Sequence, residues 1–432
     1  AEQEIPHLVA QALHGSLSFD SLEGLVRETS LRMGSQLLES LINAHQIDHS
    51  PPITHPDGRV FTYAGRKEKT FVTVLGDLHL KRSYYTDAQG SGYFPLDEQL
   101  GLDKDSLSSG VKRMVGHAAS ALSFEESSQM IDRLAALHIG SKQVERTAEA
   151  LGKEIAQRGE SEVNETVPCS STMYLGIDGT GCPVRKEETE DRKGKQPDGS
   201  AKTREVKLAV VFSADRTDTD GTHVRDRGSV SYNAAIESAA TRDLEGDLSQ
   251  FASRVEREAT RRGFDQAQRK VIIGDGAPWI WNIADELFPD AIQIIDLYHA
   301  KGTVTNAAKA IFGNESDIGV QWAKECRDSL EAGDLKTIIA RLEPFTKKCD
   351  TARTCSEYLH KNAERLDYPR FKAMGLTTSS GIVESSCKHA IGARVKQSGM
   401  HWTVNGANAI IALRCSILNG HFDSFMDQRK GA

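Results

Sequence analysis

Three aspartates each come directly after a short apolar run that is typical of a buried β-strand. Asp178 follows Tyr-Leu-Gly-Ile, Asp275 follows Val-Ile-Ile-Gly, and Asp296 follows Ile-Gln-Ile-Ile. Open sheets bind ligands in the crevice beyond their strand ends, so carboxylates at these positions can converge. Glu384 offers a fourth carboxylate at the start of an expected helix.

Carboxylates that share one site need a cation between them. Like charges within a few ångströms repel, so one of the groups would otherwise be protonated. Mg²⁺ takes oxygen ligands and needs only one or two carboxylates per ion. Two such ions about 3.5–4 Å apart can activate the attacking oxygen and stabilise the leaving oxygen of a phosphodiester. Gly179 and Gly276, which follow two of the aspartates, would let backbone or phosphate approach closely.

Each candidate also has an ordinary structural interpretation. Asp178 begins an Asp-Gly pair, which is common in turns. Asp275 can cap a helix that has Pro278 in its first turn. Glu384 can simply pair with Lys388, four residues later on the same helix face. The functional prediction therefore rests on the order of these residues along the chain.

The elements that must position these residues form an α/β pattern from Met173 onward. Strands are predicted at residues 173–177, 206–213, 228–232, 270–274 and 291–295. Helices are predicted at residues 247–262, 278–288 and 380–395, and a charged loop at 185–205. Three β units followed by a βαβ unit indicate a mixed sheet with helices on its faces. Residues 297–373 read as nearly continuous helix, too long for a connection inside a compact α/β unit, so we expect a helical insertion.

The pattern of the N-terminal part indicates a different architecture. Apolar residues recur near a 3.6-residue period within residues 5–48, which predicts a helix. Alternating runs over residues 60–85 indicate an antiparallel β unit. Residues 105–155 are predicted to be helical, with a capping box that begins at Ser123. A second helix is predicted from Ser141 to Gly152. This pair fits a helix-turn-helix, although an ordinary αα-hairpin has the same pattern.

Composition and charge narrow the function classes. The 432 residues include seven Cys and no Cys-x-x-Cys pair, which argues against a disulfide scaffold and favours a reducing cytoplasm. No apolar run approaches the ~20 residues of a membrane span. The net charge of −8 lies entirely in residues 1–170, whereas residues 368–422 carry six basic residues and one carboxylate, Glu384. This basic stretch is where a nucleic-acid partner would be expected.

The order of strand-Asp, strand-Asp, long helical insertion and helix-Glu resembles the DDE transposases of bacterial insertion sequences. The details look most like the ISKra-type group, which is related to the Mutator-like transposases. The matching segments are Tyr174–Thr180, Ile273–Ala277, Asp296–Ala300, Gly381–Ser385 and Met400–Ile410 with Leu413-Arg414, and upstream Phe94–Asp97 and the helix pair at 124–151. The resemblance covers most of the chain.

The resemblance implies an α/β fold with an RNase H-like catalytic core, in which helices flank a mixed five-stranded sheet. An all-helical insertion and an N-terminal α+β region with a helix-turn-helix-like pair complete the implied fold. The implied organisation is an N-terminal helical segment (1–50), a small Cys-less zinc-knuckle-like β unit (51–104), a helical DNA-binding region (105–168), the first part of the core (169–300), the insertion (301–375), and the final core helix with the C-terminal tail (376–432).

Carried over by position, Asp178, Asp275 and Glu384 match the catalytic and metal-binding set of this family. Asp296 and His299 match the D-x-x-H signature that follows the second acid, which makes them possible accessory residues.

Basic residues near the final acid are expected to contact DNA. Lys388, Arg394 and Lys396 would neutralise phosphates and give a salt-dependent affinity. Trp402 would either stack on an exposed base or lie in the core. The implied partners are double-stranded DNA, as terminal inverted repeats and target DNA, and further copies of the chain on that DNA. A membrane is not among the expected partners, and the expected location is the bacterial cytoplasm, nucleoid-associated when the protein is bound to DNA.

The implied reaction is Mg²⁺-dependent cleavage of DNA at insertion-sequence ends, followed by strand transfer into target DNA. Two Mg²⁺ ions are expected, for which Mn²⁺ can substitute. No zinc is expected, because the N-terminal β unit lacks the cysteine pairs that many relatives have. The alternatives are an RNase H-like nuclease that cuts without joining, and a domesticated, non-catalytic DNA-binding protein. Three intact acids favour an active enzyme over the second alternative.

Overall fold

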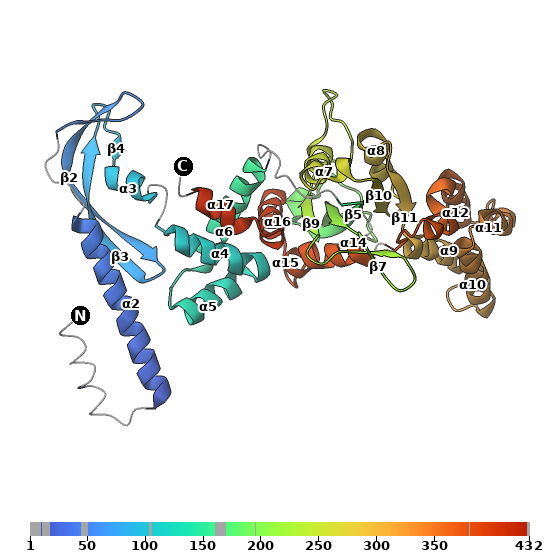
Figure 1. The fold of residues 1–432 in the computed structure, drawn as a ribbon, viewed down its shortest axis with the longest axis horizontal. Helices are drawn as coiled ribbons and strands as arrows, with labels where there is room; N and C mark the ends of the chain where they lie inside the picture. The colour runs from blue at the N-terminus through green and yellow to red at the C-terminus, as the bar shows by residue number, and fades with distance from the viewer. Residues whose placement is uncertain are drawn as a thin grey trace. The chain divides into compact units, whose positions relative to one another are not determined.

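The structure, a computed structural model, describes residues 10, 18–44, 51–102, 106–159, 170–194, 196–379 and 381–429. The chain divides into two compact units (Figure 1): unit 1 comprises residues 1–148 and 423–432, and unit 2 comprises residues 149–422. The first and last residues of the predicted N-terminal helix, Cys169, and the predicted start of the final helix at Ser380 lie outside the described residues.

Unit 1 contains a four-stranded antiparallel sheet with a long helix packed on it. The strands follow the order β1 (Ile53–Thr54), β2 (Val60–Thr73), β3 (Gly76–Thr86) and β4 (Gly92–Tyr93). Leu38 and Ile42 of α2 (Phe19–Ala44) pack against a buried cluster of Phe71, Leu78 and Leu80. The antiparallel unit predicted from alternating residues is confirmed, because β2 and β3 pair along almost their whole length.

Four helices follow this sheet among the described residues: α3 (Pro95–Leu100), α4 (Ser109–Ala121), α5 (Phe124–Ala135) and α6 (Ser141–Arg158), which continues into unit 2. The capping box at Ser123 is confirmed: its side chain and that of Glu126 each bond to the other's backbone. Arg113 of α4 forms ion pairs of 2.6 and 2.5 Å with Asp423 and Asp427 of α17 (Phe422–Gln428). A DNA-binding role for α5 and α6 stays a prediction.

Unit 2 is built on a five-stranded mixed sheet with the order β11-β10-β5-β6-β9. Its strands are β5 (Thr172–Pro183), β6 (Thr203–Ser213), β9 (Ser231–Ala235), β10 (Arg269–Gly274) and β11 (Ile292–Ile295), and a small ribbon of β7 (Arg216–Thr217) and β8 (His223–Val224) lies between β6 and β9 in sequence. Strands β5, β6 and β9 are antiparallel neighbours, whereas β10 and β11 run parallel to β5. The predicted mixed sheet is therefore confirmed, and its strand order is consistent with an RNase H-like core.

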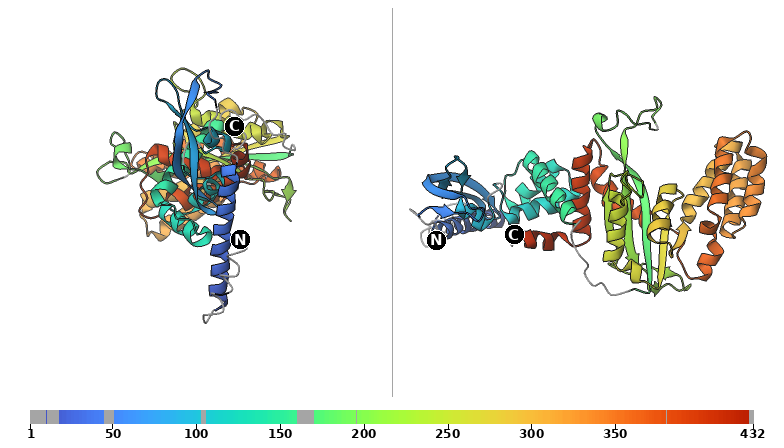
Figure 2. Two further views of the ribbon diagram at one scale, coloured as in Figure 1. Left: turned by 90° about the vertical axis from the view of Figure 1, so that its left-hand side faces the viewer. Right: turned by 90° about the horizontal axis from the view of Figure 1, so that it is seen from above.

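Helices flank this sheet, and an insertion adds a second helical group. The flanking helices include α7 (Gln250–Arg261), α8 (Pro278–Leu287) and α16 (Val404–Leu418). The insertion contains α9 (Leu297–Phe312), α10 (Asp317–Glu331), α11 (Leu335–Leu342), α12 (Asp350–Lys361) and α13 (Tyr368–Ala373). Its helices gather on the β11 side of the sheet in Figures 1 and 2. The predicted helical insertion at 297–373 is confirmed.

The final helix of the core is irregular. α14 (Gly381–Ser386) continues into a π-helical segment, η5 (Cys387–Gly392), and then into α15 (Ala393–Val395). π-Helical turns inside α-helices are rare and are often found at functional sites.

Several predicted boundaries are wrong. The strand predicted at 173–177 does not end before Asp178, because β5 pairs with β6 as far as Pro183. α6 does not end at Gly152, because this glycine serves close packing: a Cβ there would lie 1.9 Å from the carbonyl oxygen of Ala409 in α16. The third strand begins at Ser231 and not at Gly228, which has a left-handed backbone (φ 71°) suited to a turn.

Candidate active site

Asp178 and Asp275 lie next to each other on paired parallel strands: Asp275 directly follows β10, whereas Asp178 lies within β5, which continues to Pro183. Ile177 of β5 pairs with Gly274 of β10, and the next residue in each strand direction is one of the two aspartates. Adjacent parallel strands are about 4.8 Å apart, so this register brings together two acids that are far apart in sequence. The predicted convergence of these two aspartates therefore has a direct structural basis.

Asp178 has a half-buried carboxylate that accepts two hydrogen bonds. The backbone N–H of Gly179 donates to one oxygen at 2.7 Å, and the thiol of Cys387 donates to the other at 3.3 Å. Burial raises the pKa of Asp178 above its ordinary value, and the charge of Asp275 acts in the same direction, while the two donors and His299 oppose it. A cation between the two aspartates would relieve their repulsion.

Asp275 is held by the turn that follows β10. Its Oδ1 accepts a hydrogen bond from the backbone N–H of Ala277 at 2.8 Å, which is the geometry of an Asx turn. The N-cap position of α8 is Ala277, whose side chain makes no capping bond. Asp275 therefore shapes the approach to α8 without being its cap residue.

Side chains occupy the space that the two glycines leave open. A Cβ on Gly276 would lie 2.0 Å from Cε2 of Tyr358, a residue of α12 in the insertion. A Cβ on Gly179 would lie 2.6 Å from a carboxylate oxygen of Glu205 in β6. In this structure, protein side chains fill the positions where we expected backbone or phosphate to approach.

The helix that carries the third acid docks on β5 beside Asp178. A Cβ on Gly176 would lie 2.3 Å from Cγ2 of Val383, so α14 approaches this strand as closely as a side chain allows. Cys387, one turn later, reaches Asp178 from the same helix. These two contacts hold the backbone of Glu384 at the edge of the acid pair.

The side chain of Glu384 is largely exposed to solvent. It is 68% exposed and forms an ion pair of 2.8 Å with Lys388. The hydrogen bond from Lys388 lowers the pKa of Glu384. The structure thus brings Asp178 and Asp275 together, whereas the carboxylate of Glu384 remains in solvent. Glu384 instead forms the i,i+4 ion pair with Lys388 that the sequence analysis gave as its ordinary structural interpretation.

Asp296 and His299 occupy the first turn of α9. Asp296 is the N-cap of this helix: its buried carboxylate accepts the backbone N–H of His299 at 2.6 Å. The imidazole of His299 is exposed and close enough to Asp178 to lower its pKa. The Asp therefore positions the helix, and the His faces the candidate site.

Of the four residues predicted to contact DNA, two are exposed beside the acids. Lys388 is 76% exposed, and exposed Lys396 donates from Nζ to the hydroxyl of Thr180 at 2.6 Å, two residues after Asp178 on β5. Both lysines are therefore available at the same edge of unit 2.

The predictions that Arg394 binds phosphate and that Trp402 stacks on a base are corrected by the structure. Arg394 has no exposed surface and lies over the ring of Trp402 at 5.1 Å. Trp402 is 7% exposed, and its indole N–H donates to the carbonyl of Val395 at 3.0 Å. Both side chains belong to the core, the other interpretation that we gave for the Trp, because they are buried against each other.

Cys387 and Tyr358 are two neighbours of the acids that the sequence analysis did not identify. Cys387 lies three residues after Glu384, and residues at this spacing share one face of a helix. The sequence could therefore have indicated that Cys387 lies near the acids. Tyr358 comes from the middle of the insertion, and no sequence spacing connects it with Asp275.

Among the described residues, no group of three or more His, Cys, Asp and Glu side chains is arranged to hold a metal ion. Asp178 and Asp275 nevertheless supply two oxygen ligands from adjacent strands. Mg²⁺ is commonly held by one or two carboxylates and keeps several waters, so this pair fits magnesium.

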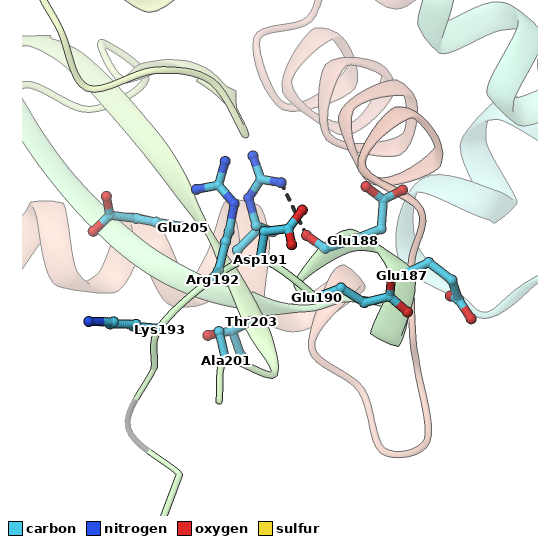
Figure 3. A pocket seen from close by; sticks show the side chains of 10 residues that line it. Glu187, Glu188, Glu190, Asp191, Arg192, Lys193, Ala201, Thr203 and Glu205 are labelled. Carbon is cyan, nitrogen blue, oxygen red and sulfur yellow. Dashed lines mark hydrogen bonds between the residues drawn. The ribbon is translucent and has the colours of Figure 1, made fainter. Parts of the chain in front are cut away.

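A separate groove of about 670 Å³ lies along the connection between β5 and β6 (Figure 3). Its charged side chains are five acids (Glu187, Glu188, Glu190, Asp191 and Glu205) and three bases (Arg192, Lys193 and Arg204). None of the predicted site residues lines it. The excess of carboxylates makes it unsuited to phosphate, so we do not assign it to the site.

The model of a family described as "Uncharacterised protein family (UPF0236)" matches residues 12–425. Two similar relatives are UPF0236 proteins of Caldanaerobacter subterraneus subsp. tengcongensis. One is 19% identical over 426 residues, covering 97% of this chain and 82% of the relative. The other is 20% identical over 428 residues, with the same coverage. The name of the first relative joins eleven numbered designations of that strain.

Among solved structures, the Drosophila P element transposase strand transfer complex is similar to 76% of this chain and 82% of its own. The identity is 10% and the TM-score 0.27, a level that carries no argument about fold or function. Within the ranges that the structure describes, no helix combines the length and the apolar character that crossing a membrane requires.

Proposed function

The chain belongs to the uncharacterised protein family UPF0236, and we propose that it is a DDE transposase of an insertion sequence. Its reaction would be DNA cleavage at the element ends, followed by transfer of the freed 3′-OH to target DNA. The ISKra-type group is the resemblance on which the finer assignment rests. One observation carries the proposal: the parallel register of β5 and β10, which pairs Ile177 with Gly274 and so juxtaposes Asp178 and Asp275.

Three further observations support this assignment. The helix that carries Glu384 contacts β5 at two points: Val383 packs on Gly176, and Cys387 bonds to Asp178. The five-stranded mixed sheet has the strand directions that the resemblance implies. A single protein name that joins eleven designations of one strain is what a multicopy mobile element would produce.

Asp178 and Asp275 would hold the Mg²⁺ ions, and Glu384 would complete the set after its side chain leaves Lys388. When bound, Mg²⁺ would activate the attacking oxygen and stabilise the leaving oxygen of the phosphodiester. Lys388, once released by Glu384, and Lys396 would bind phosphates of the DNA beside the acids. The exposed imidazole of His299 would act as an accessory group at the same edge, and Asp296 would orient it by capping α9.

A strand-transfer assay with element-end DNA and Mg²⁺ tests the proposal. Joined products support a transposase, cut but unjoined products indicate an RNase H-like nuclease, and binding alone indicates a non-catalytic DNA-binding protein. Asp275→Asn keeps the side-chain oxygen that accepts the N–H of Ala277, so the fold should persist. Removal of a residue that only hydrogen-bonds to a metal ligand typically costs up to roughly 100-fold in activity. Because Asp275 would itself be a ligand, we expect the cleavage rate of Asp275→Asn to fall by more than this.

DNA affinity of this variant should stay near that of the wild type, because a carboxylate does not attract phosphates. Asp290→Asn is the matched control, because Asp290 is an exposed acid in the loop before β11. We expect this variant to cut DNA at the wild-type rate. Undiminished cleavage by Asp275→Asn would remove Asp275 from the candidate site.

A further inference from the structure

The insertion contributes one side chain to the immediate surroundings of Asp275, and this contact is unusual. Tyr358 of α12 lies so close to Gly276 that any Cβ at this glycine would meet the ring. The contact fixes the ring against the residue that directly follows the acid. The position of the aromatic group is therefore set by backbone packing and does not depend on its hydroxyl.

The hydroxyl of Tyr358 is buried and has no hydrogen-bond partner among the described residues. A buried polar group without a partner is costly, and in native proteins it usually points to a functional role or to a water or ion at the site. The surroundings include acids: the charges of Asp275 and Asp296 both raise the pKa of Tyr358, in addition to the larger effect of burial. A phenol is a hydrogen-bond donor, so this hydroxyl is available to an acceptor that enters its surroundings.

The neighbouring Tyr368 of α13 provides a contrast within the same insertion. It is fully buried, and its hydroxyl donates to the carbonyl of Ile295 in β11 at 3.1 Å. Its role is thus explained by a bond that attaches the insertion to the sheet. Tyr358 lies against Gly276, the residue after Asp275, and its hydroxyl has no such bond.

We propose that Tyr358 is a positioning residue for the acid pair, whose hydroxyl donates to Asp275 or to its bound water once a divalent cation and DNA occupy the site. The inference rests on the proposed function. It gives the insertion a task in the reaction: α12 orients a carboxylate that β10 supplies. Hydrogen bonds to metal-ligating groups fix ligand orientation, and their loss typically costs 10–100-fold in metal affinity or activity.

Tyr358→Phe and Tyr368→Phe, each in the full chain, form a matched pair for the test. Mn²⁺ binding is measured by titration, DNA cleavage by initial rates over a range of DNA concentrations, and stability by the melting temperature. For Tyr358→Phe we expect Mn²⁺ affinity and kcat to fall about 10-fold or more, with little change in KM. Its melting temperature should stay equal or rise, because an unpartnered hydroxyl is removed.

For Tyr368→Phe we expect the opposite pattern: a lower melting temperature, because the carbonyl of Ile295 loses its donor, with Mn²⁺ affinity and kcat unchanged. If the wild type binds Mn²⁺ and cuts DNA, and Tyr358→Phe matches it in both, the inference is overturned and the proposed function stands. If the wild type does neither, the proposed function fails, and this inference fails with it.

Discussion

Asp178 and Asp275 differ in what holds their carboxylates. Asp178 is bonded from two sides, by a backbone amide and by the thiol of Cys387, whereas Asp275 is bonded within its own turn. The thiol stays protonated because burial and the neighbouring charge of Asp178 raise the pKa of Cys387. At the scale of single residues, the helix after Glu384 therefore fixes the first aspartate, and the local backbone fixes the second.

Asp226 is a carboxylate whose contribution is structural and can be tested by pH. It accepts hydrogen bonds from the hydroxyl of Ser213 at 2.6 Å and from the backbone N–H groups of Asp215 and Arg216. Burial alone would raise the pKa of Asp226, but these donors stabilise the charged form and bring the pKa below its ordinary value of 3.8. Asp226 thus links the segment between β6 and β9 to the end of β6.

We expect Asp226→Asn to lower the free energy of unfolding by about 1 kcal/mol at pH 7, a value reduced for its partial exposure to solvent. A depressed pKa contributes stability that is present above pH 3.8 and is lost as the pH falls through the native-state value. The difference between variant and wild type should therefore shrink below pH 3.8. Denaturant unfolding at pH 7, 5 and 3 measures it, with exposed Asp220→Asn as the control. A difference that is constant over this range would contradict the assignment.

At the scale of elements, the close packing of α14 on β5 is the contact that brings the third acid near the first. Gly176→Ala would put a methyl group 2.3 Å from Cγ2 of Val383 and force the helix outward. We expect a loss of about 1–3 kcal/mol in the free energy of unfolding, as for other overpacked sites. DNA cleavage should also fall, because Glu384 and Cys387 move with α14.

The double variant Gly176→Ala/Val383→Ala tests that explanation. Removal of Cγ2 makes room for the new methyl group, so the two changes should be strongly non-additive and cleavage should partly recover. Gly302→Ala in α9 is the control: a Cβ there meets nothing within 4 Å, and we expect stabilisation of about 0.4–1 kcal/mol. Simple additivity of the two changes would show that the packing of α14 is not the cause.

At the scale of the whole molecule, the chain carries a net charge of −8, so the proposed function requires a local basic region for DNA. Lys388 and Lys396 are exposed cations on the helix of Glu384 and at Thr180 of β5. We expect each Lys→Gln change to weaken DNA binding on all sequences and to reduce the slope of log affinity against log salt by about 1.

Affinity measured at several salt concentrations checks this expectation. Lys347→Gln, an exposed lysine of the insertion, is the control and should leave the slope unchanged. If Lys388→Gln and Lys396→Gln also leave it unchanged, the DNA lies on another surface, and unit 1 becomes the next region to test.

Much of the fold could be predicted because its causes are local. Apolar runs before Asp-Gly pairs identified β5 and β10, and the unbroken helical pattern of 297–373 identified the insertion. The juxtaposition of Asp178 and Asp275 followed from the expected parallel pairing of these strands, although Asp178 lies within β5 and not at its end.

Tertiary structure alone decided which side chains face solvent and which side chains meet. A basic residue reads the same in sequence whether it lies in water, as Lys396 does, or against Trp402 in the core, as Arg394 does. A glycine such as Gly152 reads as a helix end until a second helix is found against it. These outcomes depend on contacts between segments distant in the chain, whose partners no local pattern encodes. The approach of Tyr358 to Gly276 is of this kind, because it depends on how an entire insertion folds back onto the sheet.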